Sequence, residues 1–181
     1  MLSSTFKHIN AQINIMDLIE QFHKQAKFKK KTNRNYYKRL GRKNTKGLDD
    51  VFHSLHESAF ENIDCLECAN CCKTTSPMFT KTDIKRIAKD QKMSVAEFSK
   101  KYLRVDEDGD TVLKSSPCPF LGEDNYCGIY EVRPKACREY PHTNRKQMHQ
   151  ILKTTYLNTL ICPAVFEITE QLKQILPDRE M

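Results

Sequence analysis

The residues with the most evident chemistry are the eight cysteines, half of which fall within eight consecutive positions. These four form the run Cys65-Leu-Glu-Cys68-Ala-Asn-Cys71-Cys72, and no cysteine precedes it. In a C-x-x-C segment the two intervening residues bend the backbone so that both sulfurs can reach one metal ion. The chain start lacks the continuous apolar segment of a secretory signal. In a protein that is not exported, clustered cysteines indicate metal ligation rather than a disulfide framework.

The spacing of the first three cysteines favours an iron–sulfur cluster over zinc. The pattern C-x2-C-x2-C opens the bacterial ferredoxin run, in which the last ligand is followed by proline. Cys72 comes too early for that last position, but Cys118 and Cys162 are each followed by proline. The pattern therefore predicts a ligand set that is drawn from distant parts of the chain.

The adjacent pair Cys71 and Cys72 bears on the number of metal centres. Neighbouring side chains diverge, so we expect either one ligand and one structural cysteine, or two cysteines that face different centres. The sequence permits one cluster with spare cysteines, two separate four-thiolate centres, or a bridged multinuclear site. Single cysteines could also be buried as small apolar residues without binding metal. The candidate metal ligands are Cys65, Cys68, Cys71, Cys72, Cys118, Cys127, Cys137 and Cys162.

Two arginines close to Cys137 are candidates for binding the metal cofactor. A zinc ion with four thiolates, or a four-iron cluster with four, carries a net charge of about −2. Arg133 and Arg138 would offset that charge and donate hydrogen bonds to sulfur, unless they are ordinary surface arginines. His53 and His56 stand three residues apart on a predicted helix, so both could reach one metal ion. The competing interpretation is that they lie on a solvated helix face.

An ordered series of motifs accompanies the cysteine run. They are Cys118-Pro-Phe-Leu121, Cys127-Gly-Ile-Tyr130, Arg133-Pro134-x-x-Cys137-Arg138-Glu-Tyr140-Pro141 and Cys162-Pro163. Together with the run at 65–72, they resemble the YkgJ-like cysteine-cluster family over about residues 48–176. The resemblance implies a zinc- or iron-chelating domain that binds metal through these cysteines. A characterised relative in that family is flagellin lysine N-methylase, which is linked to an iron–sulfur cluster and S-adenosylmethionine.

The net charge of +7 is concentrated in one segment. Residues 24–46 hold eleven of the thirty Lys and Arg residues and no acid. Phe28, Tyr36 and Tyr37 are interleaved with these charges, a composition that could neutralise phosphates and stack on bases. We interpret the segment as an exposed basic arm that binds RNA or a protein partner. A solvated charge run and docking on the domain's own acidic surface are the alternatives.

Apolar residues at helical spacing predict a mainly α-helical fold with short β-hairpins, in a small domain nucleated by metal at the cysteine cluster. We expect an amphipathic helix over residues 1–23, so that 1–47 comprise this helix and the basic arm, and 48–181 the metal-binding domain. The remaining expected elements are a helix from Leu48, helices that start at Thr80 and Ser94 with acidic capping partners, turns at 106–110 and 122–125, a helix within 145–160, and a last helix from Pro163 to Leu176.

The sequence thus predicts a metal-binding protein that holds an iron–sulfur cluster, or zinc, in a structural or redox role. The alternative is an iron–sulfur-dependent protein lysine N-methyltransferase that uses S-adenosylmethionine. No G-x-S-x-G, Walker, G-x-G-x-x-G or H-E-x-x-H motif occurs, so the common hydrolase, nucleotide-binding and zincin classes lack support. No segment approaches the roughly 18 apolar residues of a membrane span, and we expect a cytoplasmic protein.

Overall fold

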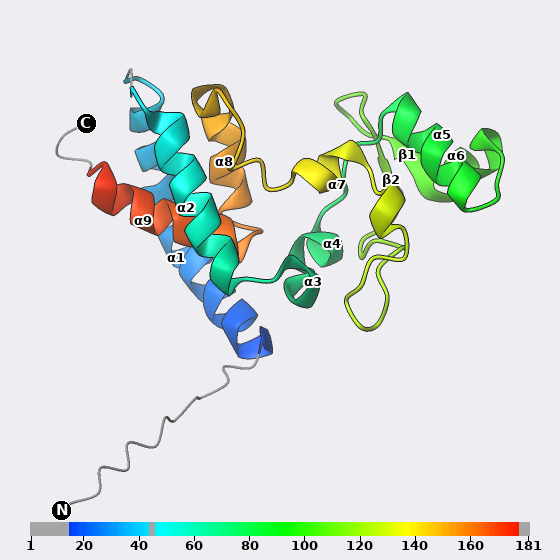
Figure 1. The fold of residues 1–181 in the computed structure, drawn as a ribbon, viewed down its shortest axis with the longest axis horizontal. Helices are drawn as coiled ribbons and strands as arrows, with labels where there is room; N and C mark the ends of the chain where they lie inside the picture. The colour runs from blue at the N-terminus through cyan, green and yellow to red at the C-terminus, as the bar shows by residue number, and fades with distance from the viewer. Residues whose placement is uncertain (1–14, 44–45, 178–181) are drawn as a thin grey trace, which may run out of the picture.

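The computed structural model describes residues 15–43 and 46–177, which form two lobes joined by short helices. The helical lobe contains α1, α2, α8 and α9, and the hairpin lobe contains α5, α6, β1 and β2 (Figure 1). The short helices α3, α4 and α7 lie between them. Each lobe has its own cluster of buried apolar side chains, so the segment between the lobes is not part of either core.

The helical lobe forms because four amphipathic helices bury their apolar faces against one another. Its core joins side chains such as Phe52 of α2 and Ile168 of α9. Near the start of α1, Phe22 packs edge-on against Phe166 of α9, with ring centroids 5.8 Å apart. The four helices are α1 (Ile15–Leu40), α2 (Leu48–Asn62), α8 (Leu152–Asn158) and α9 (Pro163–Ile175).

The hairpin lobe begins with two capped helices, α5 (Lys81–Asp90) and α6 (Val95–Tyr102). Both starts are capping boxes, in which a Ser or Thr hydroxyl and an acidic side chain satisfy each other's backbone N–H groups. Strands β1 (Leu103–Val105) and β2 (Thr111–Leu113) then pair antiparallel. Gly109 turns the chain between them with a positive φ of 84°.

The connecting segments are short, and most of them carry cysteines. They are α3 (Cys65–Cys68), α4 (Asn70–Thr74), the 3₁₀ helix η1 (Tyr130–Val132), α7 (Lys135–Glu139) and the 3₁₀ helix η2 (Met148–Ile151). Helices of four or five residues are not stable alone, since nucleation costs more than one turn of hydrogen bonds returns. Their position therefore depends on contacts with the two lobes.

Most of the expected elements are confirmed. The mainly α-helical fold with a short hairpin, both capping boxes, the turn at 106–110 and the last helix are present. The turn at 122–125 is present as well, closed by a bridge between Leu121 and Cys127. The helix expected within 145–160 is split into η2 and α8. The expected helix over 1–23 lies largely outside the described residues, which cover only its part within α1.

The prediction of an exposed arm at 24–46 is wrong for most of the segment, because α1 continues to Leu40 and packs on the helical lobe. Tyr36 and Tyr37 are buried in its core, and only Phe28 of the three aromatic side chains is exposed. The Tyr37 hydroxyl hydrogen-bonds Thr169 of α9 at 2.8 Å. The residues of α1 and α9 that contact each other lie far apart in sequence. The local charge pattern therefore could not indicate these contacts. The division of the chain at residue 47 stays a prediction.

Within the described ranges, no helix combines the length and the apolar character that crossing a bilayer requires.

One buried carboxylate ties the hairpin lobe to the segment that leads into α7. Asp83 accepts hydrogen bonds from Thr80 at the start of α5, from Arg86 at 2.6 Å and from the backbone N–H of Lys135 at 3.1 Å. The Arg86 guanidinium also donates to the carbonyl of Arg133 at 2.9 Å. This carboxylate therefore positions the stretch that carries Arg133.

We expect Asp83→Asn to destabilise the protein by about 2–4 kcal/mol, because it removes the charge from a buried, hydrogen-bonded pair. The matched control is Glu97→Gln in the exposed capping box of α6, which should cost less than about 1 kcal/mol. Chemical denaturation followed by circular dichroism measures both. Equal losses in the two variants would contradict the anchoring role of Asp83.

Candidate metal centre

The eight cysteines gather in the region between the two lobes. A cavity of about 350 Å³ lies there, and six of them line it: Cys65, Cys71, Cys72, Cys118, Cys127 and Cys137. The other two, Cys68 and Cys162, are buried beside it. All eight are free thiols. The structure therefore brings together residues that span almost a hundred positions of the chain.

Four thiols come from a tight helical turn. Asp64 caps α3 by accepting a hydrogen bond from the N–H of Leu66 at 2.7 Å. Ala69 then takes a left-handed conformation, with φ 46°, which ends α3 and starts α4. This sharp corner places Cys65 and Cys68 on one short helix and the Cys71–Cys72 pair on the next, so that the run folds around the cavity.

Cys162 approaches this corner from the helical lobe. It is the residue before α9, whose first helical position is Pro163. The side-chain amide of Asn70, which is buried, donates to the carbonyl of Ile161 at 2.6 Å. This hydrogen bond holds the chain next to Cys162 against the start of α4.

Cys118 and Cys127 approach from the hairpin lobe. The N–H of Cys118 donates to the carbonyl of Cys72 at 2.8 Å, which fixes this loop to α4. The N–H of Gly128 donates to the carbonyl of Phe120 at 2.8 Å, so Cys127 returns to the neighbourhood of Cys118. Cys137 is reached through α7, which leads from η1 back towards the helical lobe.

Burial raises the pKa of most of these thiols. The pKa is raised to about 11 for Cys65 and Cys118 and to about 12 for Cys137 and Cys162, in each case chiefly because burial disfavours the thiolate. Neighbouring cysteines contribute a smaller effect in the same direction. In the metal-free protein these thiols are therefore held in the neutral form.

Cys72 is the exception among the eight. Its sulfur lies 4.0 Å from that of Cys71. The hydrogen bond from the Cys71 thiol lowers the pKa of Cys72 to about 7, and Lys73 contributes to the same shift. The pKa of Cys71 is raised correspondingly, first by this hydrogen bond and then by burial.

The hydroxyl of Tyr140 is a buried polar atom for which the described part of the chain offers no hydrogen-bond partner. Its ring lines the cavity, and its main electrostatic neighbours are Cys162, Cys71, Cys65 and Cys68. A buried donor that lacks a partner costs free energy unless a ligand satisfies it. A thiolate or an inorganic sulfide would accept this O–H, so Tyr140 and the thiols fit a metal–sulfur group chemically. The sequence places Tyr140 in a motif but does not indicate this donor.

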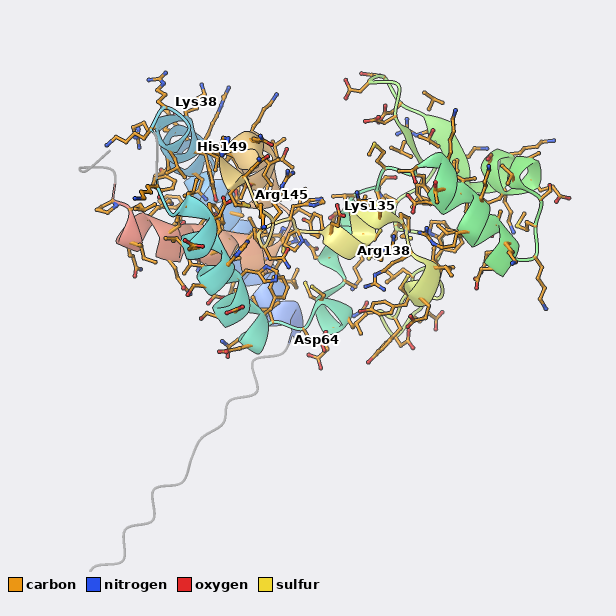
Figure 2. All side chains as sticks on the ribbon, turned by 45° about the horizontal axis from the view of Figure 1, so that its top comes forward. Lys38, Asp64, Lys135, Arg138, Arg145 and His149 are labelled. Carbon is orange, nitrogen blue, oxygen red and sulfur yellow. The ribbon has the colours of Figure 1, made fainter. Side chains whose placement is uncertain are left out.

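The two candidate arginines are placed differently. Arg133 lines the cavity, stacks on the Tyr130 ring with 3.7 Å from its guanidinium carbon to the centroid, and interacts electrostatically with Cys127 and Cys137. Arg138 is exposed on α7, as is Lys135, and does not line the cavity (Figure 2). The role of Arg138 towards a cofactor stays a prediction.

The histidines of α2 are already engaged in hydrogen bonds. His56 bonds the Thr143 hydroxyl at 2.8 Å through Nδ1, and His53 bonds the carbonyl of Arg145 at 3.2 Å through Nε2. In the described part of the chain, no three His, Cys, Asp or Glu side chains converge closely enough to hold a single ion. The thiols surround a space instead of meeting at one point.

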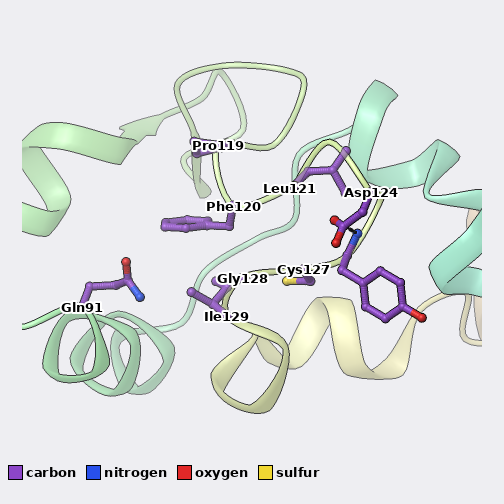
Figure 3. Close-up of a pocket in the computed structure, with 10 residues that line it drawn as sticks. Gln91, Pro119, Phe120, Leu121, Asp124, Cys127, Gly128 and Ile129 are labelled. Carbon is purple, nitrogen blue, oxygen red and sulfur yellow. Dashed lines mark hydrogen bonds between the residues drawn. The ribbon is translucent and has the colours of Figure 1, made fainter.

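A second cavity, of about 420 Å³, borders the cysteine region on the side of the hairpin lobe. Figure 3 shows the Phe120 ring and Gln91 on one side of it and the Leu121–Asp124 turn on the other. Cys127 is the one cysteine among its lining residues and also lines the cavity described above.

Comparison with known proteins places this region in a family. The model of the CxxCxxCC family, described as "Putative zinc- or iron-chelating domain", matches residues 64–158. An uncharacterized protein of Methanocaldococcus jannaschii is 34% identical over 82 residues. That alignment covers 44% of this chain and 44% of the relative, so the chain spans less than half the length of the relative it matches. No solved structure matches the chain.

The raised thiol pKa values predict how the metal-free protein responds to pH. An unfolded thiol ionises near pH 9, whereas Cys65, Cys118, Cys137 and Cys162 hold their protons to about pH 11–12 in the folded chain. Stability is thus fully present below about pH 9 and is lost as pH rises towards 12. Cys72 acts in the opposite direction but is one of eight.

Urea denaturation of reduced protein in chelator should therefore show a lower free energy of unfolding at pH 10 than at pH 8. Metal-loaded protein is the control. Its thiolates are already ionised and charge-balanced by the metal, so the same change of pH should leave its stability nearly constant. A metal-free protein that is equally stable at both pH values would refute the burial argument.

Proposed function

This chain belongs to the CxxCxxCC family, and on that premise we propose that its cysteines hold an iron–sulfur centre in a structural or electron-carrying role. The observation that carries the proposal is the thiol-lined cavity between the lobes, with six cysteines on its wall and two buried beside it. Thiolates are the ligands of both iron–sulfur clusters and structural zinc. When bound, the centre supplies positive charge among the buried thiols and, if it contains iron, one-electron chemistry.

Two features favour iron and sulfide over a single zinc ion. The run Cys65-x2-Cys68-x2-Cys71 has the spacing that opens the ferredoxin run, and the Cys-Pro pair at 162–163 could supply its last ligand from a distant part of the chain. The thiols also surround an open space instead of one point, as a polynuclear group requires. The alternative function is a lysine methyltransferase that uses S-adenosylmethionine. It comes second because only the family resemblance supports it.

The chain's own residues would orient and tune such a centre. The Tyr140 hydroxyl, which has no partner in the described structure, would donate to a sulfur of the centre. Arg133 would lower the negative charge on the side of Cys127 and Cys137. Hydrogen bonds and charges of this kind adjust the reduction potential of a cluster and the basicity of its ligands.

The test is an absorption spectrum of anaerobically purified full chain, with iron, sulfide and zinc measured on the same sample. We expect broad visible absorption and matching amounts of iron and sulfide. Because the chain has no tryptophan, the visible bands will stand out against a weak absorption at 280 nm. Stoichiometric zinc in a colourless sample would refute the iron–sulfur proposal, and no bound metal would refute metal binding altogether.

The exposed face of α1 supports a role in binding RNA. Lys27, Lys31, Arg34 and Lys38 are exposed and follow one another at helical steps of three and four residues, so they form a single basic stripe. Phe28, beside the stripe, is 86% exposed and could stack on a base. The stripe runs along the helical lobe, with Lys38 at its far end (Figure 2).

A triple variant of the stripe carries Lys27→Gln, Lys31→Gln and Arg34→Gln. It should bind single-stranded RNA at least ten-fold more weakly, because three phosphate contacts are lost. The slope of log K against log salt should fall by about 2. Its matched control, Lys81→Gln/Lys85→Gln/Lys89→Gln on α5, makes the same change of charge on the other lobe and should bind like wild type. Filter binding at several salt concentrations measures both, with metal content unchanged. Equal losses in the two triple variants would indicate general charge attraction, and no loss would point to a protein partner.

A further inference from the structure

The turn at residues 122–126 is joined to the short helix α3 beside the thiol-lined cavity. We propose that this turn is a gate, that the side-chain amide of Asn125 holds it closed, and that metal enters and leaves the cavity between the turn and α3. The proposal rests on the proposed metal-binding function. It assigns Asn125 as a positioning residue of the centre.

The hydrogen bond of Asn125 connects two segments of the cavity wall. Its side-chain amide donates to the backbone carbonyl of Glu67 at 2.9 Å. Asn125 lines the cavity, and so do Cys65 and Leu66 of α3. The bond therefore holds the loop that carries Cys127 against the helix that carries Cys65.

This part of the wall is close to solvent. Cys65 is exposed, whereas the other seven thiols are buried or half-buried. Glu67 and Tyr126, which flank the hydrogen bond, are exposed too, and Tyr126 is 55% exposed. Among the described residues, neither hydrophobic core includes a side chain of α3 or of the 122–126 turn. The turn can therefore open without disturbing either core.

The turn has its own hydrogen bonds, so it can move as one unit. The N–H of Gly122 donates to the carbonyl of Tyr126 at 2.8 Å. The Asp124 carboxylate accepts a hydrogen bond from the N–H of Tyr126 at 3.0 Å. At the base of the turn, Leu121 and Cys127 pair as an isolated bridge (Figure 3). These contacts stay intact when the hydrogen bond to α3 breaks.

The start of the same loop is fastened to α4 instead. The N–H of Cys118 donates to the carbonyl of Cys72 at 2.8 Å. The hydroxyl of Ser116 donates to the carbonyl of Lys73 at 2.9 Å. Because these two hydrogen bonds hold the start of the loop, loss of the Asn125 bond would release the 122–126 turn while the loop stays attached to α4.

The backbone conformation of Asn125 provides clean substitutions. Its φ is 67°, in the left-handed region that glycine, asparagine and aspartate adopt more readily than other residues. Asn125→Gly therefore removes the amide donor and keeps the backbone conformation. Asn125→Asp keeps the shape of the side chain, but a carboxylate only accepts hydrogen bonds and cannot donate to the carbonyl of Glu67.

The first test needs no metal. Both variants are reduced, freed of metal and pulsed with iodoacetamide, and the modified thiols are located by peptide mass spectrometry. Cys71 and Cys137, which are half-buried and line the cavity, should react about three- to ten-fold faster than in wild type, because one hydrogen bond of the closed state is lost. Cys162 is buried outside the lining and should react at the wild-type rate.

The second test measures metal exchange. Full-length protein, as purified with its iron or zinc, is mixed with an excess of a chromophoric chelator of both ions. Both variants should release metal about three- to ten-fold faster than wild type. Their initial metal content and their free energy of unfolding in urea should be unchanged, which a merely structural role of Asn125 would not predict.

The matched control is Asp124→Asn in the same turn. It keeps the side-chain oxygen that accepts from the N–H of Tyr126 and does not touch the bond to α3, so it should match wild type in both tests.

Other outcomes would overturn the gate. A wild-type rate of both variants in either test would do so. Faster alkylation of Cys162 together with Cys71 and Cys137 would indicate general loosening, and an effect of Asn125→Gly that Asn125→Asp does not share would indicate glycine flexibility. Wild type purified without metal would instead refute the proposed function, while the alkylation test would still decide whether the turn opens. The two failures are therefore distinguishable.

Discussion

The arrangement of this protein depends on eight thiols that gather between two small hydrophobic cores, of which two are buried, five are half-buried and Cys65 is exposed. The short helices α3, α4 and α7 carry five of the eight cysteines and belong to neither core. Segments of four or five residues gain too little from their own hydrogen bonds to be stable, so their position depends on contacts between lobes. Burial holds most of the thiols in the neutral form, and a bound metal would exchange their protons for coordinate bonds at that location. A metal bound there would therefore contact segments that are held by both lobes.

Each lobe contributes a direct link to the cysteine region, and the links differ in chemistry. On the helical side one link is the side-chain amide of Asn70, which holds the chain before Cys162, and another is the amide of Asn158, which donates to the carbonyl of Pro141 at 3.3 Å. On the hairpin side the backbone hydrogen bond of Cys118 with Cys72 is joined by charged contacts, in which Asp83 and Arg86 fix the backbone at residues 132–135 and thereby place Arg133 over Tyr130. A charged link is acceptable there because Asp83 is fully hydrogen-bonded, which offsets the cost of removing it from water.

The sequence predicts best what is decided locally. Both capping boxes, the glycine turn of the hairpin and the proline start of α9 depend on side chains within four residues, and all are present. The basic segment was misread because its structure depends on α9, where the hydroxyl of Tyr36 reaches the carbonyl of Leu176 at 3.1 Å. Likewise, the cysteines could be selected by type and spacing, but Tyr140 could not be recognised as an unpaired donor, because its burial depends on how distant segments meet.

Cys71 and Cys72 lie side by side on a helix that contacts both lobes. A five-residue helix has room for one full turn, and on one turn only neighbouring or next-but-one residues point to clearly different sides. Two adjacent cysteines can therefore face a helical lobe on one side and a hairpin lobe on the other while their sulfurs stay within 4.0 Å. The doubled cysteine thus lets one short helix place a thiol towards each lobe.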